Sequence, residues 1–267
     1  MQGKYEKNVD MEKLTVIKVG GKVVEEQASL ERLLDDFAGM EGRKLLVHGG
    51  GRSATRLATL LGIESRMVDG RRITDAETLK VVTMVYAGLA NKSVVAGLQK
   101  RGVNALGLCG ADLASVVSDK RPLKNGIDYG FVGDVKKVNG AELAKLINGD
   151  VVPVMAPLSF SFTDGLLNTN ADTMAGEIAK AMSGFFDTTL TFCFEKRGVL
   201  RDEDDDDSVI ESITPSLFEE YKQSGVIRGG MIPKLENAFA AINAGVKKVV
   251  ICNAAEVALN RGTVVGG

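Results

Sequence analysis

Two glycine-rich turns are the parts of this sequence whose residue types are best suited to chemistry. An apolar run at residues 44–48 ends in three consecutive glycines at 49–51, and a second run at 14–19 ends in the glycine pair at 20–21. Because glycine has no Cβ atom, a ligand can approach the backbone closely and several N–H groups can point into one concavity. A helix that begins behind such a turn adds partial positive charge. The two turns therefore predict a site for an anion.

Two lysines from distant parts of the chain are candidates to meet that anion. Lys18 lies near the end of the first apolar run, and Lys234 follows a third glycine-rich turn at residues 229–230, close to the predicted start of a helix. The helix dipole disfavours a cation at that position, and a residue that breaks a local rule is a candidate for function. The alternative for each is a lysine whose side chain extends past apolar surface into solvent.

Polar residues at two further places extend the set of candidates. Asn170 is a suitable N-cap and Asp172 a favourable first-turn acid, so capping alone explains both, whereas Asn168 is left to face a polar ligand. Arg71 and Arg72 lie together in a predicted hairpin. A guanidinium group binds a carboxylate in a bidentate way that lysine cannot reproduce, although one of the two arginines can simply be solvated.

Composition and charge exclude several classes of function. The net charge of −2 gives no electrostatic basis for binding nucleic acid or an anionic membrane, and no apolar run has the length of a membrane span. The single histidine, His48, excludes a two-histidine metal site, and we expect it to bond the loop backbone rather than act as a catalytic base. We expect no metal site built by the protein alone. The acidic run at 202–207 is predicted to be a solvated turn, because consecutive carboxylates on a turn diverge.

The cysteines and the first residues suggest an intracellular protein. The three cysteines are odd in number, widely spaced, and each ends an apolar run. We interpret Cys109, Cys193 and Cys252 as buried free thiols, which suits a reducing cytoplasm. Residues 1–10 are polar, without a pattern and without the apolar core of a signal peptide, so we expect Met11 to be the natural start.

The elements that must position these residues alternate between strands and helices. Near-continuous apolar runs, which indicate strands covered on both faces, occur at residues 14–19, 44–48, 103–108, 151–156, 188–194 and 247–252. Amphipathic helical patterns occur at residues 29–40, 75–101, 171–183 and 233–244. This alternation predicts an α/β fold, namely a three-layer αβα sandwich with a mainly parallel central sheet. Hairpins and loops that decorate one end of the sheet are predicted at residues 63–74, 114–138 and 158–167.

A soft boundary near residue 185 divides the predicted fold into two lobes. The length suits one large α/β unit or two lobes that share a core. We therefore expect an N-terminal lobe over residues 1–185 and a C-terminal lobe over residues 186–267. Loops that follow parallel strands open at the same edge of a sheet, which is where open α/β sheets bind ligands.

One alternative reading concerns the glycines at 49–51. Residues 49–54 satisfy the dinucleotide pattern G-x-G-x-x-G/A, and Asp69 could serve as the acid that binds a ribose. This alternative predicts a nicotinamide-dependent oxidoreductase. The pattern follows the second predicted strand rather than the first, and it leaves two further glycine-rich turns unexplained. We therefore favour phosphate binding over dinucleotide binding.

The combined set of residues favours phosphoryl transfer to a carboxylate. Catalysis of phosphoryl transfer consists mostly of positioning and charge neutralisation, which glycine amides and lysines supply. The set contains no obvious general base. A hydroxyl acceptor can need such a base, whereas a carboxylate acceptor, with a pKa of about 4, is already ionised at neutral pH.

Six motifs, ordered along nearly the whole chain from about Met11, resemble those of the N-acetylglutamate kinases of the amino acid kinase family. The motifs are KVGG at 18–21, HGGG at 48–51, GRRIT at 70–74, GFVGDV at 130–135, NTNAD at 168–172 and GGMIPK at 229–234. The resemblance implies the αβα fold of that family, with hairpins over the substrate end. It implies a cytoplasmic enzyme of arginine biosynthesis that uses ATP and Mg²⁺ to phosphorylate the γ-carboxylate of N-acetyl-L-glutamate or another N-acyl-L-glutamate.

The resemblance also implies roles for single residues. Lys18 and Lys234 would stabilise the transferring phosphoryl group, and Asp172 would hold both lysines by charge pairing. The glycines implied to donate N–H groups to the phosphoryl oxygens are Gly20, Gly21 and Gly50. The residues implied to bind the acceptor are Gly50, Gly51, Arg72 and Asn168. The residues implied to bind the nucleotide are Glu195, Gly198, Gly230 and Met231.

Departures from the family pattern keep several alternatives open. Glu195 stands where the family usually has Asp, beside the bulky and basic Lys196 and Arg197, so the ATP contacts there are open. Residues 157–162 replace a usual Ile-Gly on the side where the acyl group would lie, so a longer acyl group such as succinyl is an alternative. A related kinase for another small acid and a non-catalytic sensor of the same fold also remain. Without a long N-terminal helix, the resemblance implies an arginine-insensitive homodimer joined through the helix at 75–101.

Overall fold

A large central sheet organises the structure, a computed structural model that describes residues 11–68, 70–259 and 261–266. Its strands are β1 (Lys13–Val19), β2 (Arg43–His48), β5 (Ala105–Leu108), β8 (Val152–Met155), β11 (Asp187–Phe194), β12 (Ser212–Ile213), β13 (Lys248–Asn253) and β14 (Thr263–Val265). They lie in the order β12-β14-β13-β11-β1-β2-β8-β5, and only the β13–β14 pair is antiparallel. Each of the six predicted strands forms part of this sheet, so the mainly parallel arrangement is confirmed.

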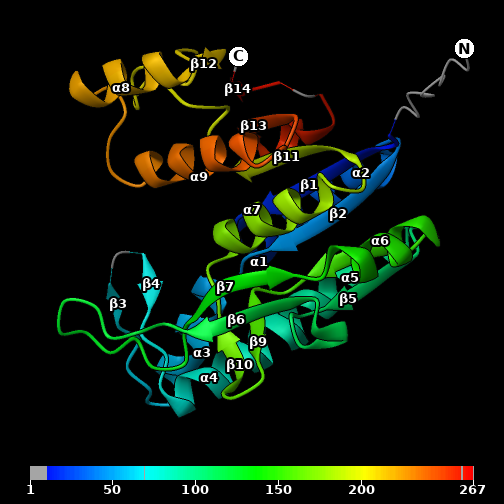
Figure 1. The fold of residues 1–267 in the computed structure, drawn as a ribbon, viewed down its shortest axis with the longest axis vertical. Coiled ribbons are helices and arrows are strands. Elements are labelled where there is room, and N and C mark those ends of the chain that lie inside the picture. Colours follow the sequence, from blue (N-terminus) through cyan, green and yellow to red (C-terminus); the bar gives the residue numbers. More distant parts are fainter. Residues whose placement is uncertain (1–10, 69, 260, 267) are drawn as a thin grey trace, which may run out of the picture.

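Helices cover both faces of the sheet (Figure 1). They are α1 (Gly21–Glu25), α2 (Gln27–Gly39), α3 (Gly51–Leu60), α4 (Ala76–Val82), α5 (Asn91–Gln99), α6 (Gly140–Asn148), α7 (Ala171–Met182), α8 (Pro215–Gln223) and α9 (Met231–Asn243). Two short 3₁₀ segments are η2 (Asp112–Ala114) and η3 (Ala254–Leu259). The apolar core on one face includes residues of α6, α7, α8 and α9, and the core on the other face includes residues of α1, α2, α5 and η3. The predicted three-layer αβα sandwich is therefore confirmed.

The alternation of side chains along β1 decides which core each residue joins. Leu14 and Val16 are fully buried in the core that contains α7, whereas Ile17 and Val19 are fully buried in the core that contains α2. Side chains in a strand point alternately to opposite faces of the sheet. Lys18 therefore belongs to the same face as Leu14 and Val16, at the end of the strand that leads into the first glycine turn.

The three segments predicted as hairpins form smaller sheets at one end of the molecule. These strands are β3 (Met67–Val68), β4 (Arg71–Arg72), β6 (Val116–Lys120), β7 (Gly133–Val138), β9 (Leu158–Ser161) and β10 (Gly165–Asn168). The first two pair as an antiparallel ribbon, and the other four form a sheet of order β10-β9-β6-β7. Figure 1 shows these strands gathered beside α3 and α4. The hairpin prediction is confirmed.

The helix predicted over residues 75–101 is present, but it contains a segment that the sequence did not reveal. Helices α4 and α5 are joined by the π-helical segment η1 (Thr83–Ala90), so the helix runs without a break over Ala76–Gln99. These 24 residues are long and apolar enough to span a membrane by length and composition alone. Half of the most apolar window is buried inside the protein, as in the core helix of a globular fold.

The predicted division into two lobes falls in the turn between α7 and β11. Strand β1 pairs with β2 on one side and with β11 on the other. A single sheet therefore crosses the boundary at residue 185, and the division into residues 1–185 and 186–267 stays a prediction. Residues 1–10, which we set apart in the sequence, lie outside the described residues.

Candidate active site

The first two glycine turns lie against each other at one edge of the sheet. Strands β1 and β2 are parallel neighbours, so the turns that follow them open on the same side. A Cβ atom on Gly49 would lie 2.7 Å from the amide nitrogen of Gly21, and a Cβ atom on Gly21 would lie 3.0 Å from that of Gly50. The two backbones therefore pack at a distance that only glycine permits.

The amide groups of these turns divide into two sets. Gly20 and Gly49 donate their N–H groups to strand carbonyls at 3.1 and 3.0 Å, which ties each turn to the sheet. The N–H groups of Gly21, Gly50 and Gly51 have no acceptor within the described part of the chain. Gly21 and Gly51 are also the first residues of α1 and α3, where helix N–H groups lack internal partners. The paired turns therefore form a cradle for an anion.

Lys18, two residues before the first glycine turn, pairs with an acid. Its ammonium nitrogen lies 2.7 Å from Oδ1 of Asp172, and the two side chains are 13% and 19% exposed. Asp172 lies in the first turn of α7, whose N-cap Asn170 accepts the N–H of Thr173 at 3.0 Å. The capping role predicted for Asn170 is confirmed, and the carboxylate of Asp172 pairs with Lys18.

Lys234 reaches the same place from the other end of the chain. It lies in the first turns of α9, whose N-cap is Gly230, and its ammonium nitrogen lies 4.3 Å from the centre of the Phe194 ring. Burial lowers the pKa of Lys234, the charge of Asp172 raises it, and the charge of Lys18 lowers it further. The structure therefore brings the two lysines and Asp172 into one electrostatic environment.

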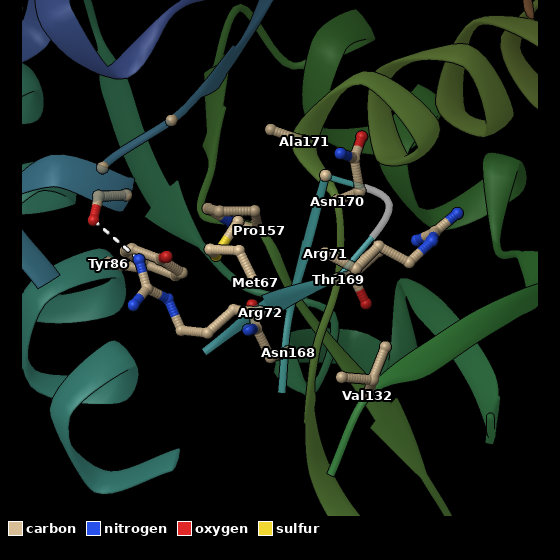
Figure 2. A pocket seen from close by; sticks show the side chains of 14 residues that line it. Met67, Arg71, Arg72, Tyr86, Val132, Pro157, Asn168, Thr169, Asn170 and Ala171 are labelled. Carbon is tan, nitrogen blue, oxygen red and sulfur yellow. Dashed lines mark hydrogen bonds between the residues drawn. The ribbon is translucent and has the colours of Figure 1, made fainter. Parts of the chain in front are cut away.

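A cavity of about 180 Å³ opens beside the glycine cradle (Figure 2). All four residues predicted to bind the acceptor line it, namely Gly50, Gly51, Arg72 and Asn168. Three further lining residues, Met67, Tyr86 and Val132, were not singled out in the sequence as site residues. Of the residues at 157–162 expected beside the acyl group, only Pro157 lines the cavity, and Phe162 is 79% exposed. Leu158, Ser159 and Ser161 are buried in β9 and do not line the cavity, so this run gives no reason to expect a longer acyl group.

Hydrogen bonds hold Arg72 firmly in the wall of the cavity. Its Nη2 donates to the carbonyl of Gly51 at 2.9 Å and to Oγ1 of Thr55 at 2.8 Å, and its Nη1 donates to Oγ of Ser65 at 2.7 Å. Guanidinium carries five N–H groups, so two remain, and the Nε atom is buried with no partner. A buried donor without a partner is costly, and an anionic ligand would satisfy it.

Asn168 and Tyr86 complete the polar wall. The Nδ2 atom of Asn168 donates to Oγ1 of Thr74 at 2.9 Å, and this bond orients the side-chain amide. Asn168 is 7% exposed. Tyr86 lies beside Arg72 in Figure 2, and a Cβ atom on Gly50 would lie 2.9 Å from its ring. Burial raises the pKa of Tyr86, while the charge of Arg72 opposes the shift. The phenol is therefore neutral at physiological pH.

The residues predicted to bind the nucleotide come from different segments of the chain. Glu195 pairs with Lys22 at 2.9 Å and lines a second cavity of about 440 Å³ next to Gly20 and Gly21. Gly230 and Met231 begin α9 beside Lys234. Gly198 is buried, and a Cβ atom on it would lie 2.7 Å from Oγ1 of Thr263 and 2.9 Å from Cγ1 of Val209. Packing therefore explains why this position is a glycine, and the contact of Gly198 with a nucleotide stays a prediction.

His48 lies beneath the cradle and is fully buried. Its Nδ1 lies 2.8 Å from the carbonyl oxygen of Gly49, so the predicted bond to the loop backbone is confirmed. Burial lowers its pKa to about 4, although the bond to Gly49 opposes the shift. The imidazole is neutral at physiological pH and does not line the cavity.

The acidic run at 202–207 forms an exposed turn, as predicted. The turn is closed by a bridge between Leu200 and Val209, and Lys196 lies 2.7 Å from Asp206. No group of three or more His, Cys, Asp or Glu side chains in the described residues is placed to hold a metal ion.

The outcomes for the cysteines differ. Cys109 is half-buried rather than buried, whereas Cys193 and Cys252 are buried, and all three are free thiols. Asp69, the proposed ribose acid of the dinucleotide alternative, lies outside the described residues.

Relatives of this chain carry a consistent name. The acetylglutamate kinase of Bacteroides thetaiotaomicron is 68% identical over 252 residues, which are 94% of this chain and 98% of that protein. That of Phocaeicola vulgatus is 65% identical over 254 residues, which are 95% of this chain and 98% of that protein. The resemblance to N-acetylglutamate kinases is therefore confirmed.

Solved structures agree with the fold. The protein smu.665 from Streptococcus mutans has a TM-score of 0.77 at 29% identity, covering 95% of this chain and 98% of that one. The N-acetylglutamate synthase from Neisseria gonorrhoeae, complexed with coenzyme A and N-acetyl-glutamate, has a TM-score of 0.80 at 20% identity, covering 95% of this chain and 59% of that one. The model of the amino acid kinase family matches residues 13–253. This chain belongs to the amino acid kinase family.

Proposed function

We propose that this protein transfers the γ-phosphoryl group of ATP to the γ-carboxylate of N-acetyl-L-glutamate, a step of arginine biosynthesis. The observation that carries the proposal is the convergence of Lys18, Asp172 and Lys234 beside the paired glycine turns. The relatives at 65–68% identity bear the name of this activity. Phosphoryl transfer needs positioned cations and amide donors rather than covalent chemistry by the protein.

The geometry supports a direct transfer between two bound substrates. An oxygen of the ionised γ-carboxylate attacks the γ-phosphorus, the bond to the bridging oxygen of ADP breaks, and an acyl phosphate and ADP result. The lysines neutralise charge on the phosphoryl oxygens, and the N–H groups of Gly21 and Gly50 donate to them. Asp172 keeps Lys18 oriented toward the transfer path. No general base is needed, because the acceptor is ionised at neutral pH.

The acceptor fits the cavity beside the cradle. N-acetyl-L-glutamate carries an α-carboxylate besides the reacting one, and the unpartnered Nε of Arg72 offers it a donor. The amide of Asn168 is held by Thr74 at the same wall. Gly51 joins the two subsites, because its N–H faces the cradle and its carbonyl accepts from Arg72.

ATP and Mg²⁺ complete the proposed reaction. We place the nucleotide over the C-terminal part of the chain, between Glu195 and the start of α9 at Gly230 and Met231. The cradle suits the phosphate end of ATP. Since the described residues offer no cluster of acidic ligands, Mg²⁺ would be held mainly by the nucleotide phosphates, whose charge it would reduce.

A substrate panel with one control variant tests this proposal. Purified protein is incubated with ATP, Mg²⁺ and N-acetyl-L-glutamate, L-glutamate or L-aspartate, and both ADP release and hydroxylamine trapping of the acyl phosphate are measured. We expect turnover with the acetylated acceptor and its loss in Lys18→Ala, whereas Lys145→Ala, an exposed lysine on α6, should retain activity. Turnover with a different acid would favour a sibling kinase. Binding without turnover would favour a sensor, and NAD(H) binding without ATP binding would favour the oxidoreductase alternative.

A dicarboxylic acyl group such as succinyl is a second candidate for the acceptor, on the strength of Arg71. This arginine lines the same cavity, on the side away from Arg72 in Figure 2. Burial lowers its pKa, and the charge of Arg121 lowers it further. The second carboxylate of a succinyl group would neutralise the charge of Arg71. The test compares N-acetyl- with N-succinyl-L-glutamate in wild type and Arg71→Gln: a succinyl preference that disappears in the variant supports the candidate, and equal ratios reject it.

We infer further that the enzyme is a cytoplasmic homodimer joined through the helix at residues 76–99. Met84 and Leu89 on this helix are 52% and 63% exposed, and Leu106 on the neighbouring edge strand β5 is 40% exposed. Exposed apolar side chains on a helix and on an edge strand suit a subunit interface. Cys193 and Cys252 remain unbonded thiols 3.6 Å apart, which suits a reducing compartment.

A further inference from the structure

The long helix over residues 76–99 contacts the second glycine turn at two separate points. The ring of Tyr86 packs on Gly50 so closely that a Cβ atom there would lie 2.9 Å from the ring. Five residues later, Nδ2 of Asn91 lies 3.2 Å from Nε2 of His48, whose other ring nitrogen contacts the carbonyl of Gly49. Asn91 and His48 are 1% and 0% exposed, so both contacts lie in the interior.

One backbone carbonyl determines the direction of every hydrogen bond in this chain of contacts. The Nδ2 of Asn91 also lies 2.9 Å from the carbonyl oxygen of Val154, which can only accept. The amide therefore turns its NH₂ group toward both Val154 and His48, so Nε2 of His48 must accept. The single proton of the neutral ring is then on Nδ1 and is donated to Gly49. Gly107 leaves room for this arrangement, since a Cβ atom there would overlap Oδ1 of Asn91.

The π-helical segment explains how two residues five positions apart face the same turn. In an α-helix, positions separated by five residues are rotated by about 140° and point in different directions. A π-helix bonds residues five apart, which brings them onto one face. The N–H of Asn91 donates to the carbonyl of Tyr86, which is this bond between the two residues concerned. The π segment Thr83–Ala90 therefore directs both side chains at the glycine turn.

We propose that Asn91 is a positioning residue for the acceptor site, acting through His48 on the turn at Gly49–Gly51. Asn91 touches neither substrate, and its amide selects the ring tautomer that pins the carbonyl of Gly49. His48 holds the carbonyl of Gly49, and the ring of Tyr86 packs against Gly50. The N–H groups of Gly50 and Gly51 therefore face the cradle before any ligand binds. Preorganised donors of this kind lose no free energy to reorganisation when charge develops in the transition state.

The placement also predicts which substrate depends on Asn91. The turn at Gly49–Gly51 lines the acceptor cavity, whereas Glu195 and the start of α9, where we place the nucleotide, are not in contact with Asn91 or His48. Loss of the Asn91 amide should therefore weaken acceptor binding much more than nucleotide binding, because the turn contacts only the phosphate end of ATP. This consequence rests on the proposed function, whereas the tautomer and the rigidity of the turn do not.

The first experiment uses the unaltered protein. Because His48 is the only histidine of the chain, ¹⁵N-labelled histidine gives its ring signals without further assignment. We expect a neutral ring between pH 5.5 and 8, protonated on Nδ1 and unprotonated on Nε2. A ring protonated on Nε2, or a charged ring in this range, would overturn the proposal whether or not any variant folds and whether or not the protein is a kinase.

The second experiment compares Asn91→Ala with the control Gln99→Ala. Gln99 lies on the same helix and donates to the carbonyl of Ala105 at 3.0 Å, away from the glycine turn. In Asn91→Ala we expect the KM for the acceptor to rise about tenfold, with the KM for ATP within about twofold of wild type. Amide hydrogen exchange of residues 49–51 should become faster. In Gln99→Ala both KM values and the exchange of this turn should stay at wild-type levels.

The outcomes separate positioning from mere stability. A variant that only unfolds more readily lowers the amount of active enzyme, which reduces the apparent kcat and leaves both KM values unchanged. A folded Asn91→Ala protein with wild-type acceptor KM and wild-type exchange at residues 49–51 would refute the proposal. If no acceptor is phosphorylated by the wild type, the exchange and tautomer measurements still decide whether Asn91 holds the turn.

Discussion

The ammonium nitrogen of Lys18 lies 2.7 Å from the carboxylate of Asp172, although the two residues come from the first strand of the sheet and from a helix in the middle of the chain. Both side chains are mostly buried. The pair therefore holds a cation close to the first glycine turn and keeps it from extending into solvent. Because Asp172 is held by Lys18 and adjoins Lys234, we expect it to orient the lysines rather than to accept a proton.

The first prediction concerns Asp172. Asp172→Asn keeps the shape of the side chain but removes the charge that orients Lys18, so we expect kcat to fall by about 10²-fold with little change in folding. The matched control is Glu177→Gln on the same helix, which removes the partner of Lys180 on the more exposed side. Steady-state ADP release measures both variants. Equal loss in the two variants would show that charge on α7, rather than the Lys18 pair, is what matters.

The second prediction follows from the lowered pKa of Lys234. The lysine is useful only as a cation, and burial favours its neutral form. Activity should therefore fall as pH rises through a value below 10.5, the ordinary pKa of lysine. In Lys234→Arg the guanidinium stays protonated, so the remaining activity should show no such fall. A pH profile of kcat in both proteins tests this, and an identical alkaline fall in the two would assign it to another group.

The third prediction uses the close approach of Tyr86 to Gly50. In Gly50→Ala the new methyl group would lie 2.9 Å from the ring, which the π segment holds in place. We expect kcat/KM for the acceptor to fall roughly 10–100-fold, because a small displacement of the cradle misaligns the reacting atoms. Gly176→Ala in α7 is the control, since nothing lies within 4 Å of its Cβ position. That variant should be fully active and unfold at the same or a higher temperature.

The fourth prediction concerns stability at acid pH. The pKa of His48 is lowered to about 4 in the folded protein, from 6.5. Between these values the unfolded chain binds the proton more readily, so stability is lost as pH falls from 6.5 toward 4. At 1.36 kcal/mol per pKa unit, the loss between pH 6.5 and 5 amounts to about 2 kcal/mol.

Urea unfolding at several pH values tests whether stability falls with falling pH. Other groups titrate equally in wild type and in His48→Gln, so the difference in unfolding free energy between the two proteins isolates the histidine. We expect that difference to shrink as pH falls below 6.5. A difference that is constant from pH 8 to pH 5 would contradict the neutral, buried state of the ring.

The fifth prediction tests the proposed homodimer. Met84→Glu combined with Leu89→Glu places two charges on the exposed apolar face of the π segment. We expect light scattering coupled to size exclusion to give the mass of a dimer for wild type and of a monomer for the double variant. Leu123→Glu, at another exposed leucine, is the control and should remain dimeric. A wild-type monomer would reject the proposal directly.

The sequence by itself determined six strands of the central sheet, four of the helical segments that cover it, and the place where the first two glycine turns meet. Its information there is local: continuous apolar runs fit strands covered on both faces, and adjacent glycines fit turns that a phosphate can approach. The same reasoning placed Asn170 as a cap and Lys18 at a strand end. The alternation of predicted strands and helices was enough to expect a parallel sheet, in which the turns after β1 and β2 meet at one edge.

Only the tertiary structure decided which residues complete the site. Tyr86 and Asn91 had no distinguishing signal, because their roles depend on a π-helical segment whose residues read as an ordinary helix. The packing of Gly198 against Thr263, which accounts for a glycine there, was likewise not visible in the sequence, and its contact with a nucleotide stays a prediction. Such roles arise from contacts between segments far apart in the chain. Local sequence patterns record the periodicity of one element, whereas the distance between two elements is set by how all their side chains pack together.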